Sequence, residues 1–185
     1  MTYQSTDLSK YDNSWFNPGN GLKRTLWYFT NILFFKNAWN PSSGLKVLLL
    51  RLFGAKVGKG VRVNPSVNIK YPWFLEIEDH TWIGENVWID NLTTVKIGSN
   101  CCLSQGAMLL TGNHNYKKST FDLIIKSIIL EDGAWVGAKA VVCPGVTMKS
   151  HSILSVGSIA TKDLEAYGIY KGNPALKVKE RKIED

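Results

Sequence analysis

An aliphatic residue recurs at every sixth position over most of the chain, and this period limits the fold more than any other feature. The series begins at Val57 and runs, with three longer steps, to Ala160. Four positions after each aliphatic residue the side chain is usually small or β-branched, as at Val61, Thr81 and Ala107. A period of six fits neither an amphipathic helix nor the alternation of a plain strand. It indicates a short strand and a turn per repeat, with one large and one small side chain pointing inward.

Three such hexads make one triangular coil, and stacked coils bury a continuous core. We therefore predict an all-β fold, a single-stranded parallel β-helix of hexapeptide repeats over residues 56–165. The predicted large inward residues are Val57, Val63, Ile69, Ile77, Ile83, Ile89, Ile97, Leu103, Leu109, Ile124, Leu130, Val136, Val142, Met148, Leu154 and Ala160.

The interruptions of the repeat predict where the functional edge lies. The step lengthens to eight residues after Ile69 and after Ile89, and to fifteen residues between Leu109 and Ile124. Each longer step follows a third hexad, so all three insertions leave the prism at one corner. The longest, a loop over residues 110–123, is the predicted functional loop.

The flanking segments have no hexads. Residues 1–55 are predicted to form a separate helical cap, with a helix starting near Pro41 and Ser42. Residues 166–185 are predicted to be an extended segment followed by a short basic helix. The aromatic and basic stretch 22–35, with 45–53 behind it, is typical of packing on the first coil. A peripheral contact with a membrane surface is the alternative.

The formal charge of +7 raises the question of nucleic acid. No zinc-finger spacing or RNA-binding aromatic signature accompanies it, so we expect no nucleic-acid partner. A basic balance also suits a phosphate-bearing cofactor or an anionic membrane surface.

The cysteines and the apolar segments indicate the compartment. Cys101, Cys102 and Cys143 form neither a C-x-x-C pair nor an even framework, which favours reduced thiols. From the first residues we expect no secretory leader, and the apolar stretches 26–35 and 47–53 are too short to span a bilayer. We expect a cytoplasmic protein, with association at the inner membrane surface as the alternative.

His114 is the strongest candidate for chemistry. It lies in the longest insertion, between Asn113 and Asn115. Transfer of an acyl group from a thioester to an alcohol needs a base that works near neutrality, and imidazole is such a group. His80 and His151 each follow an inward residue by three positions, so both are predicted to be surface residues. Three histidines that are distant in sequence make the three-ligand zinc site of a carbonic anhydrase improbable, and we expect no metal.

Several motifs resemble those of one enzyme family. They are the hexads, Thr111-Gly112-Asn113-His114, Trp135-Val136-Gly137 with Pro144-Gly145-Val146, Thr161-Lys162 and Gly172-Asn173-Pro174-Ala175. Together they resemble the hexapeptide-repeat O-acetyltransferases, which include the maltose and galactoside acetyltransferases. The segments 87–92, 103–107 and 111–114 are similar to the colanic acid biosynthesis acetyltransferase subgroup.

The resemblance implies a left-handed β-helix and a homotrimer with active sites between subunits. It implies acetyl-CoA as the donor and His114 as the catalytic residue. Asp90 stands where the sugar acetyltransferases keep an acceptor-binding asparagine, and with Asn113 it is predicted to bind the substrate; the alternative for Asp90 is a turn residue that caps Asn91. The predicted cofactor-binding residues are Trp135, Ala138, Val156, Gly157, Thr161, Lys162, Lys177 and Lys179.

Four of these cofactor residues have alternatives. Trp135 could border the pantetheine arm or pack between subunits, and Lys162, Lys177 and Lys179 could pair with the phosphates of coenzyme A or belong to a solvated tail. Leu176 replaces a cofactor-binding arginine of the family, and Lys179 stands for a second one.

The expected function is O-acetylation of a sugar or glycan precursor in exopolysaccharide or capsule biosynthesis. His114 takes the hydroxyl proton and backbone N–H groups stabilise the oxyanion. Without an evident nucleophile for an acyl-enzyme, we expect a ternary complex. The alternatives are N-acetylation of an amino sugar and a catalytically silent scaffold.

Overall fold

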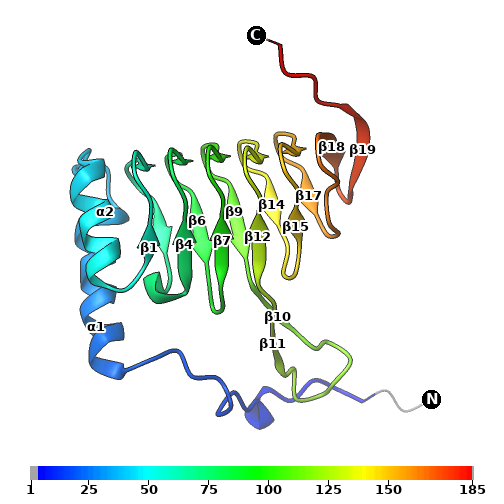
Figure 1. The fold of residues 1–185 in the computed structure, drawn as a ribbon. Coiled ribbons are helices and arrows are strands. Elements are labelled where there is room, and N and C mark those ends of the chain that lie inside the picture. The colour runs from blue at the N-terminus through cyan, green and yellow to red at the C-terminus, as the bar shows by residue number, and fades with distance from the viewer. Residues whose placement is uncertain (1–3, 185) are drawn as a thin grey trace.

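Short strands joined by tight turns stack into a triangular prism in the computed structural model, which describes residues 4–184 (Figure 1). Three parallel sheets form its faces, named here A, B and C. Face A contains β1 (Lys56–Val57), β4 (Leu75–Ile77), β7 (Val95–Ile97), β12 (Ile128–Leu130) and β15 (Thr147–Met148). Face B begins with β2 (Arg62–Val63), β5 (Trp82–Ile83), β8 (Cys102–Leu103), β13 (Trp135–Val136) and β16 (Ile153–Leu154). Face C contains β3 (Asn68–Ile69), β6 (Trp88–Asp90), β9 (Met108–Leu110), β14 (Val141–Val142) and β17 (Ile159–Ala160).

The hexad period is confirmed as the basis of the core. Fourteen of the sixteen predicted large inward residues are buried; Val57 is half-buried and Ile124 lies elsewhere. The small residues four positions on are buried too, because three faces converge on a narrow axis. Thr81 is one of the polar residues at these positions, and its hydroxyl is satisfied: it donates to the Gly98 carbonyl at 2.7 Å and accepts from the Cys101 N–H at 3.0 Å.

Ile124 was predicted wrongly. It lies in β11 (Leu123–Ile125), which pairs antiparallel with β10 (Gly112–His114) in a hairpin that leaves the prism. Face A resumes at β12, where the next residue of the hexad series is Leu130, so the step from Leu109 is twenty-one residues and the insertion spans 111–127, not 110–123. An aliphatic residue at hexad spacing can belong to a hairpin, where side chains also alternate. We call residues 111–127 the arm.

All three insertions leave the prism at the corner between faces C and A, as predicted. They follow β3, β6 and β9 on three successive coils, and the third is the arm. Figure 1 shows the arm projecting from this edge, below the stacked coils.

Two helical segments cover one end of the prism. They are α1 (Gly21–Thr30), which continues into the π-helical η2 (Asn31–Phe35), and α2 (Ser43–Leu52). The Ser42 hydroxyl accepts from the Leu45 N–H, which confirms the predicted helix start. The indole N–H of Trp27 donates to the carbonyl of Ile69 at 2.9 Å and ties α1 to the first coil. Within residues 4–184, no helix has the length and hydropathy needed to span a bilayer.

Lys46 joins α2 to the open end of the prism. Its side chain is fully buried, and its ammonium donates to the carbonyls of Asn40 at 2.7 Å and Val63 at 3.4 Å. Burial without a carboxylate partner lowers the pKa of Lys46, since desolvation disfavours the charged form.

Residues 4–20 do not belong to the helical cap, contrary to the prediction of one unit over 1–55. They run from the cap to the arm and include the 3-10 helix η1 (Leu8–Lys10) (Figure 1). At the far end the N–H of Asp7 donates to the carbonyl of Ser119 at 2.8 Å. The cap proper is therefore residues 21–52, and residues 1–3 of the predicted unit lie outside the described part.

The predicted C-terminal helix is also wrong for residues 166–184. This segment forms β18 (Gly168–Gly172), which extends face B, and β19 (Ala175–Glu180), which pairs antiparallel with β18. The Gly-Asn-Pro sequence supplies the turn between them. The chain forms strands here because β18 pairs with β16 at the free edge of face B, and β19 then pairs with β18. Lys177 and Lys179 lie exposed on this last strand, where charge protects a sheet edge from further pairing.

Two glycines give a matched test of coil spacing. A Cβ on Gly84 would lie 2.7 Å from the carbonyl oxygen of Leu103 in the next coil, whereas one on Gly44 in α2 would meet nothing within 4 Å. We expect Gly84→Ala to lower the free energy of unfolding by about 1–3 kcal/mol, because backbone must move. Gly44→Ala should raise it by about 0.4–1 kcal/mol, because the unfolded chain loses freedom. Urea unfolding measures both, and equal effects would contradict this coil register.

Candidate active site

The arm fixes the ring of His114 from two sides. Nδ1 lies 2.9 Å from the carbonyl oxygen of Phe121, and the imidazole stacks on the Phe121 ring with centroids 4.4 Å apart and planes at 8°. A carbonyl oxygen only accepts, so Nδ1 carries the proton in this contact. The neutral ring is then unprotonated at Nε2, which is the nitrogen a general base needs.

Thr111 secures the base of the arm to the coil beneath it. Its buried hydroxyl donates to the carbonyl of Asp90 at 2.9 Å and accepts from the N–H of Leu92 at 2.8 Å. The arm is thus bonded to the preceding insertion at the C–A corner. This link sets the position of His114, three residues further on, relative to Asp90.

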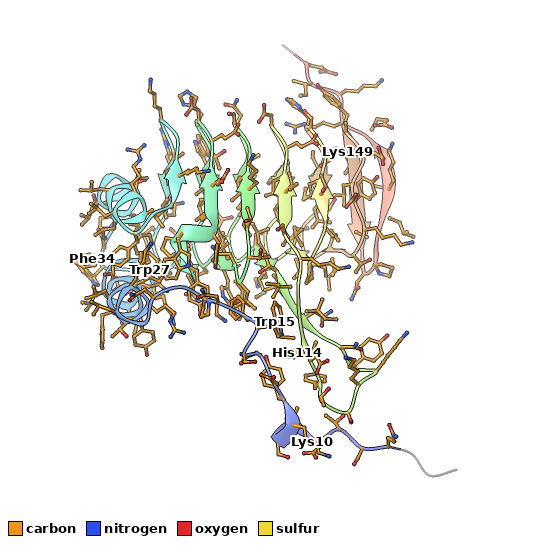
Figure 2. The ribbon with its side chains drawn as sticks, turned by 60° about the horizontal axis from the view of Figure 1, so that its bottom comes forward. Lys10, Trp15, Trp27, Phe34, His114 and Lys149 are labelled. Carbon is orange, nitrogen blue, oxygen red and sulfur yellow. The ribbon has the colours of Figure 1, made fainter. Side chains whose placement is uncertain are left out.

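A cleft of about 370 Å³ brings together the three residues predicted for catalysis and substrate binding, Asp90, Asn113 and His114. Its other lining residues come from the N-terminal segment, the C–A corner and the arm: Tyr11, Asn13, Phe16, Lys70, Tyr71, Leu92, Gly112 and Leu123. Figure 2 shows His114 on the arm beside the N-terminal segment that contains Lys10 and Trp15. The fold thus brings the N-terminal segment and the arm, which lie about a hundred residues apart in the sequence, to the same cleft.

Asp90 is a cleft residue and not a turn cap. Its side chain is 18% exposed and forms an ion pair with Lys70 at 3.1 Å. In the alternative interpretation Asp90 would cap Asn91. Asn91 is instead fully buried, and its side chain bonds to the backbone N–H and carbonyl of Tyr71. The Asp90 carboxylate thus lines the cleft together with Lys70, its ionic partner.

Asn113 has a more local role in the unliganded chain. Its Oδ1 accepts from the N–H of His114 at 2.8 Å, and the residue is exposed. The amide N–H₂ of Asn113 has no hydrogen-bond partner among the described residues, and Asn113 is one of the residues that line the cleft.

A second, larger hollow of about 550 Å³ adjoins the cleft. It lies between α1 and face C and shares Lys70, Tyr71 and Asp90 with the cleft. Arg24 and Lys36 make it basic, and Tyr28 and Trp88 supply aromatic faces. Polar groups and aromatic faces of this kind suit a polyhydroxylated ligand, and the residues shared by the two hollows place them side by side.

The predicted cofactor residues do not join His114 in one cleft of the single chain. Ala138, Val156 and Gly157 occupy turns at the corner between faces B and C, where the Gly157 N–H donates to the Ala138 carbonyl at 2.9 Å. Val156 is an apolar side chain with 68% exposure. Thr161 and Lys162 lie exposed at the C–A corner after β17.

The remaining predicted cofactor residues lie on or beside face B. Trp135 points outward from face B and donates from its indole N–H to the Ser104 hydroxyl at 2.9 Å. Lys177 pairs with Glu180, and this hydrogen bond raises the pKa of Lys177. Lys179 and Leu176 are exposed on β19.

The thiols offer no activated nucleophile. Burial raises the pKa of Cys101 to about 11, and it raises the pKa values of Cys102 and Cys143 as well. A thiol with a raised pKa holds little thiolate at neutral pH, so these cysteines are poorly suited to form an acyl-enzyme.

The other two histidines lie at the A–B corner, away from the cleft. His80 is exposed, as predicted, whereas His151 is half-buried and stacks on Tyr167 at 4.9 Å. His151 points away from the core but is covered by the C-terminal strand region. Across residues 4–184, no group of three or more His, Cys, Asp or Glu side chains is placed to hold a metal ion.

Sequence reasoning missed the contribution of the N-terminal segment. Tyr11 lies 5.7 Å from the His114 ring, and Asn13 and Phe16 line the same cleft. The only sequence signal was the run of aromatic residues before position 20, which carries no period. Phe121 was missed for a related reason, since it was counted as plain loop.

Comparison with known proteins shows which proteins the chain is similar to. No family model matches it. Over 168 residues it is 36% identical to the candidate colanic acid biosynthesis acetyltransferase WcaF of Escherichia coli K12, with 90% of this chain and 91% of the relative covered. Its fold is similar to a hexapeptide-repeat acetyltransferase of Vibrio cholerae O1 biovar eltor solved with acetyl-CoA (TM-score 0.78, 22% identity, 88% of both chains). It is also similar to a galactoside acetyltransferase solved with coenzyme A (TM-score 0.74, 23% identity, 86% and 80% covered).

Fold and sequence together define a left-handed β-helix acetyltransferase. The chain belongs to the colanic acid biosynthesis acetyltransferase family of these hexapeptide-repeat enzymes. The alternative of a catalytically silent scaffold is therefore set aside.

Proposed function

We propose that the protein transfers an acetyl group from acetyl-CoA to a sugar hydroxyl in exopolysaccharide or capsule biosynthesis, in the cytoplasm. The observation that carries this proposal is the cleft in which His114, with Nε2 unprotonated, lies with Asp90 and Asn113. Relatives add to it: one carries colanic acid biosynthesis in its name, and two solved relatives of the same fold hold acetyl-CoA or coenzyme A.

The chemistry needs one proton carrier and a held acceptor. The sugar hydroxyl oxygen attacks the thioester carbonyl while Nε2 of His114 takes its proton. The tetrahedral intermediate then collapses, the C–S bond breaks, and the imidazolium returns the proton to the leaving thiolate of coenzyme A. Asp90 and Asn113 would hold neighbouring hydroxyls, since a carboxylate accepts and an amide can donate. Because no thiol is activated, both substrates are present together during the transfer.

Coenzyme A is proposed to bind between two subunits of a homotrimer. In one chain, Ala138, Val156 and Gly157 occupy the B–C corner, whereas His114 stands on the arm at the C–A corner. A neighbouring prism that presents its B–C corner to this arm would bring the two sets together. The exposed apolar side chain of Val156 and the open space above Gly157 suit a pantetheine arm lying along that corner.

The outward residues of the three faces support a side-by-side assembly. Face A presents Lys56, Glu76 and Lys96, in which Glu76 pairs with Lys56 at 2.7 Å and Lys96 at 3.7 Å. Face B presents Trp82 and Trp135, and face C presents Trp88, Met108 and Val141. We propose that faces B and C, which carry these outward aromatic side chains, contact the two neighbouring subunits in a closed ring.

Lys162 gives a test of donor binding apart from chemistry. Its exposed ammonium is proposed to pair with a phosphate of coenzyme A, far from the reacting carbon. We expect Lys162→Ala to raise the KM for acetyl-CoA by about tenfold while kcat changes less than about twofold. Steady-state kinetics with varied acetyl-CoA measures both. Lys59→Ala, at the A–B corner away from both proposed binding sets, serves as an exposed-lysine control, and a selective fall in kcat for Lys162→Ala would contradict the assignment.

An acceptor screen tests the proposed function directly. Purified protein is incubated with acetyl-CoA and a panel of sugars, nucleotide sugars and oligosaccharide fragments, and release of free thiol is followed. Mass spectrometry and NMR of the product then locate the acetyl group. We expect an O-acetyl ester on a sugar hydroxyl. An amide on an amino sugar would replace this proposal with N-acetylation.

A further inference from the structure

The outer face of the cap is apolar on both of its helices. Each helix buries one side against the prism, through Trp27 and Phe35 or through Val47 and Leu50. The opposite side is exposed as well as apolar, with Leu22 and Leu52 each 70% exposed. We call this surface the cap patch; it consists of Leu22, Leu26, Phe29, Leu33, Trp39, Leu45, Leu48 and Leu52.

The spacing of these residues makes the patch continuous along each helix. Leu22, Leu26, Phe29 and Leu33 are three or four positions apart, and so are Leu45, Leu48 and Leu52. Figure 1 shows both helices lying across one end of the prism, so the patch faces away from the coils. Prisms that assemble side by side leave this end face open, because they contact one another through faces parallel to the prism axis.

Charge around the patch is of one sign. Residues 13–75 contain nine lysines and arginines and no aspartate or glutamate. The rest of the chain contains thirteen basic and fifteen acidic residues, so the whole positive excess of +7 comes from the cap and the first coil. Arg24 and Lys36 are exposed beside the apolar stripe of α1. An apolar face with a basic border is the pattern that binds an anionic bilayer surface.

We infer that the cap patch docks the enzyme on an anionic phospholipid bilayer, with the leucines entering the headgroup boundary and the basic residues facing lipid phosphates. In the proposed trimer three patches share one end of the assembly, so weak single contacts add up to firm binding. The basic hollow beside α1 is lined by Phe29 of the patch and continues to the His114 cleft through Lys70 and Tyr71. Docking therefore presents the acceptor route to the membrane surface.

Vesicle sedimentation tests the inference on the full chain. The variant is Leu22→Ser, Leu26→Ser, Leu48→Ser and Leu52→Ser together, none of which lines the cleft or its adjoining hollow. The control is Val178→Ser with Ile183→Ser, two exposed apolar residues at the other end of the molecule. Vesicles are phosphatidylcholine alone or with about a third phosphatidylglycerol. Circular dichroism and thiol release with a soluble acceptor show that each variant is folded and active.

Wild type and control should bind the vesicles that contain phosphatidylglycerol, and should bind vesicles of phosphatidylcholine alone at least tenfold more weakly. The cap variant should bind the phosphatidylglycerol vesicles at least tenfold more weakly than wild type does. Equal binding by the cap variant, or no binding by wild type, overturns the inference. So does a cap-dependent doubling of the assembly in light scattering without vesicle binding, since the occupant would then be a second copy. Acetyl transfer in solution is read separately, so failure of docking leaves the proposed function standing.

Discussion

Replacement of His114 by alanine should lower kcat by a factor of about 10²–10⁴, the usual contribution of a positioned general base. The KM for acetyl-CoA should change little, because His114 acts on the acceptor proton and the donor is held elsewhere. Steady-state kinetics with a verified sugar acceptor measures both.

His80→Ala is the matched control for this variant. His80 is exposed at the A–B corner and lies outside the cleft, so its loss should leave kcat within about twofold of wild type, as for most surface changes. Near-full turnover by His114→Ala would remove the imidazole from the mechanism.

Replacement of Leu103 by alanine should lower the free energy of unfolding by about 2–5 kcal/mol. Leu103 is fully buried on face B and lies in register between Ile83 and Val136 of the adjacent coils. The coils are held by stacked strands and cannot close over the missing atoms, so a cavity remains on the prism axis. Urea unfolding at one protein concentration gives the difference, because assembly makes stability depend on concentration.

Ile129→Ala is the control for Leu103. Ile129 belongs to the same kind of strand but points outward from face A, with 40% exposure. Its truncation should cost less than about 1 kcal/mol, because no cavity forms at a surface site. Equal losses at both positions would contradict the inward and outward assignment of the hexads.

The prism was predictable from sequence because its core repeats. A large residue every sixth position and a small one four positions later fix which side chains face the axis, and the structure has Leu103 and Ala107 buried accordingly. The insertions marked the C–A corner, and with it Asp90 and His114, for the same reason. An insertion can be recognised in a sequence only where the repeat on either side of it is regular.

What has no period could not be predicted. The end of the arm was misplaced because Ile124 has hexad spacing but pairs in a hairpin. The N-terminal segment joins the cleft through single long-range contacts, such as Tyr11 against His114, which no local pattern encodes. The C-terminal strand was predicted as a helix because its local sequence does not decide its structure. β19 is a strand because it pairs with β18 at the edge of face B, and this tertiary pairing has no local sequence pattern.

Mixed trimers test most directly whether His114 of one subunit serves coenzyme A held by another. One subunit is His114→Ala, and the other is Ala138→Trp, which fills the proposed pantetheine corner while keeping His114. Each should be nearly inactive alone. If each site uses the arm of one subunit and the B–C corner of its neighbour, random co-assembly at equal amounts should restore about a quarter of the wild-type rate, since one pairing in four is intact in a closed ring. No recovery in verified mixed trimers would contradict the shared site and place the whole reaction within one chain.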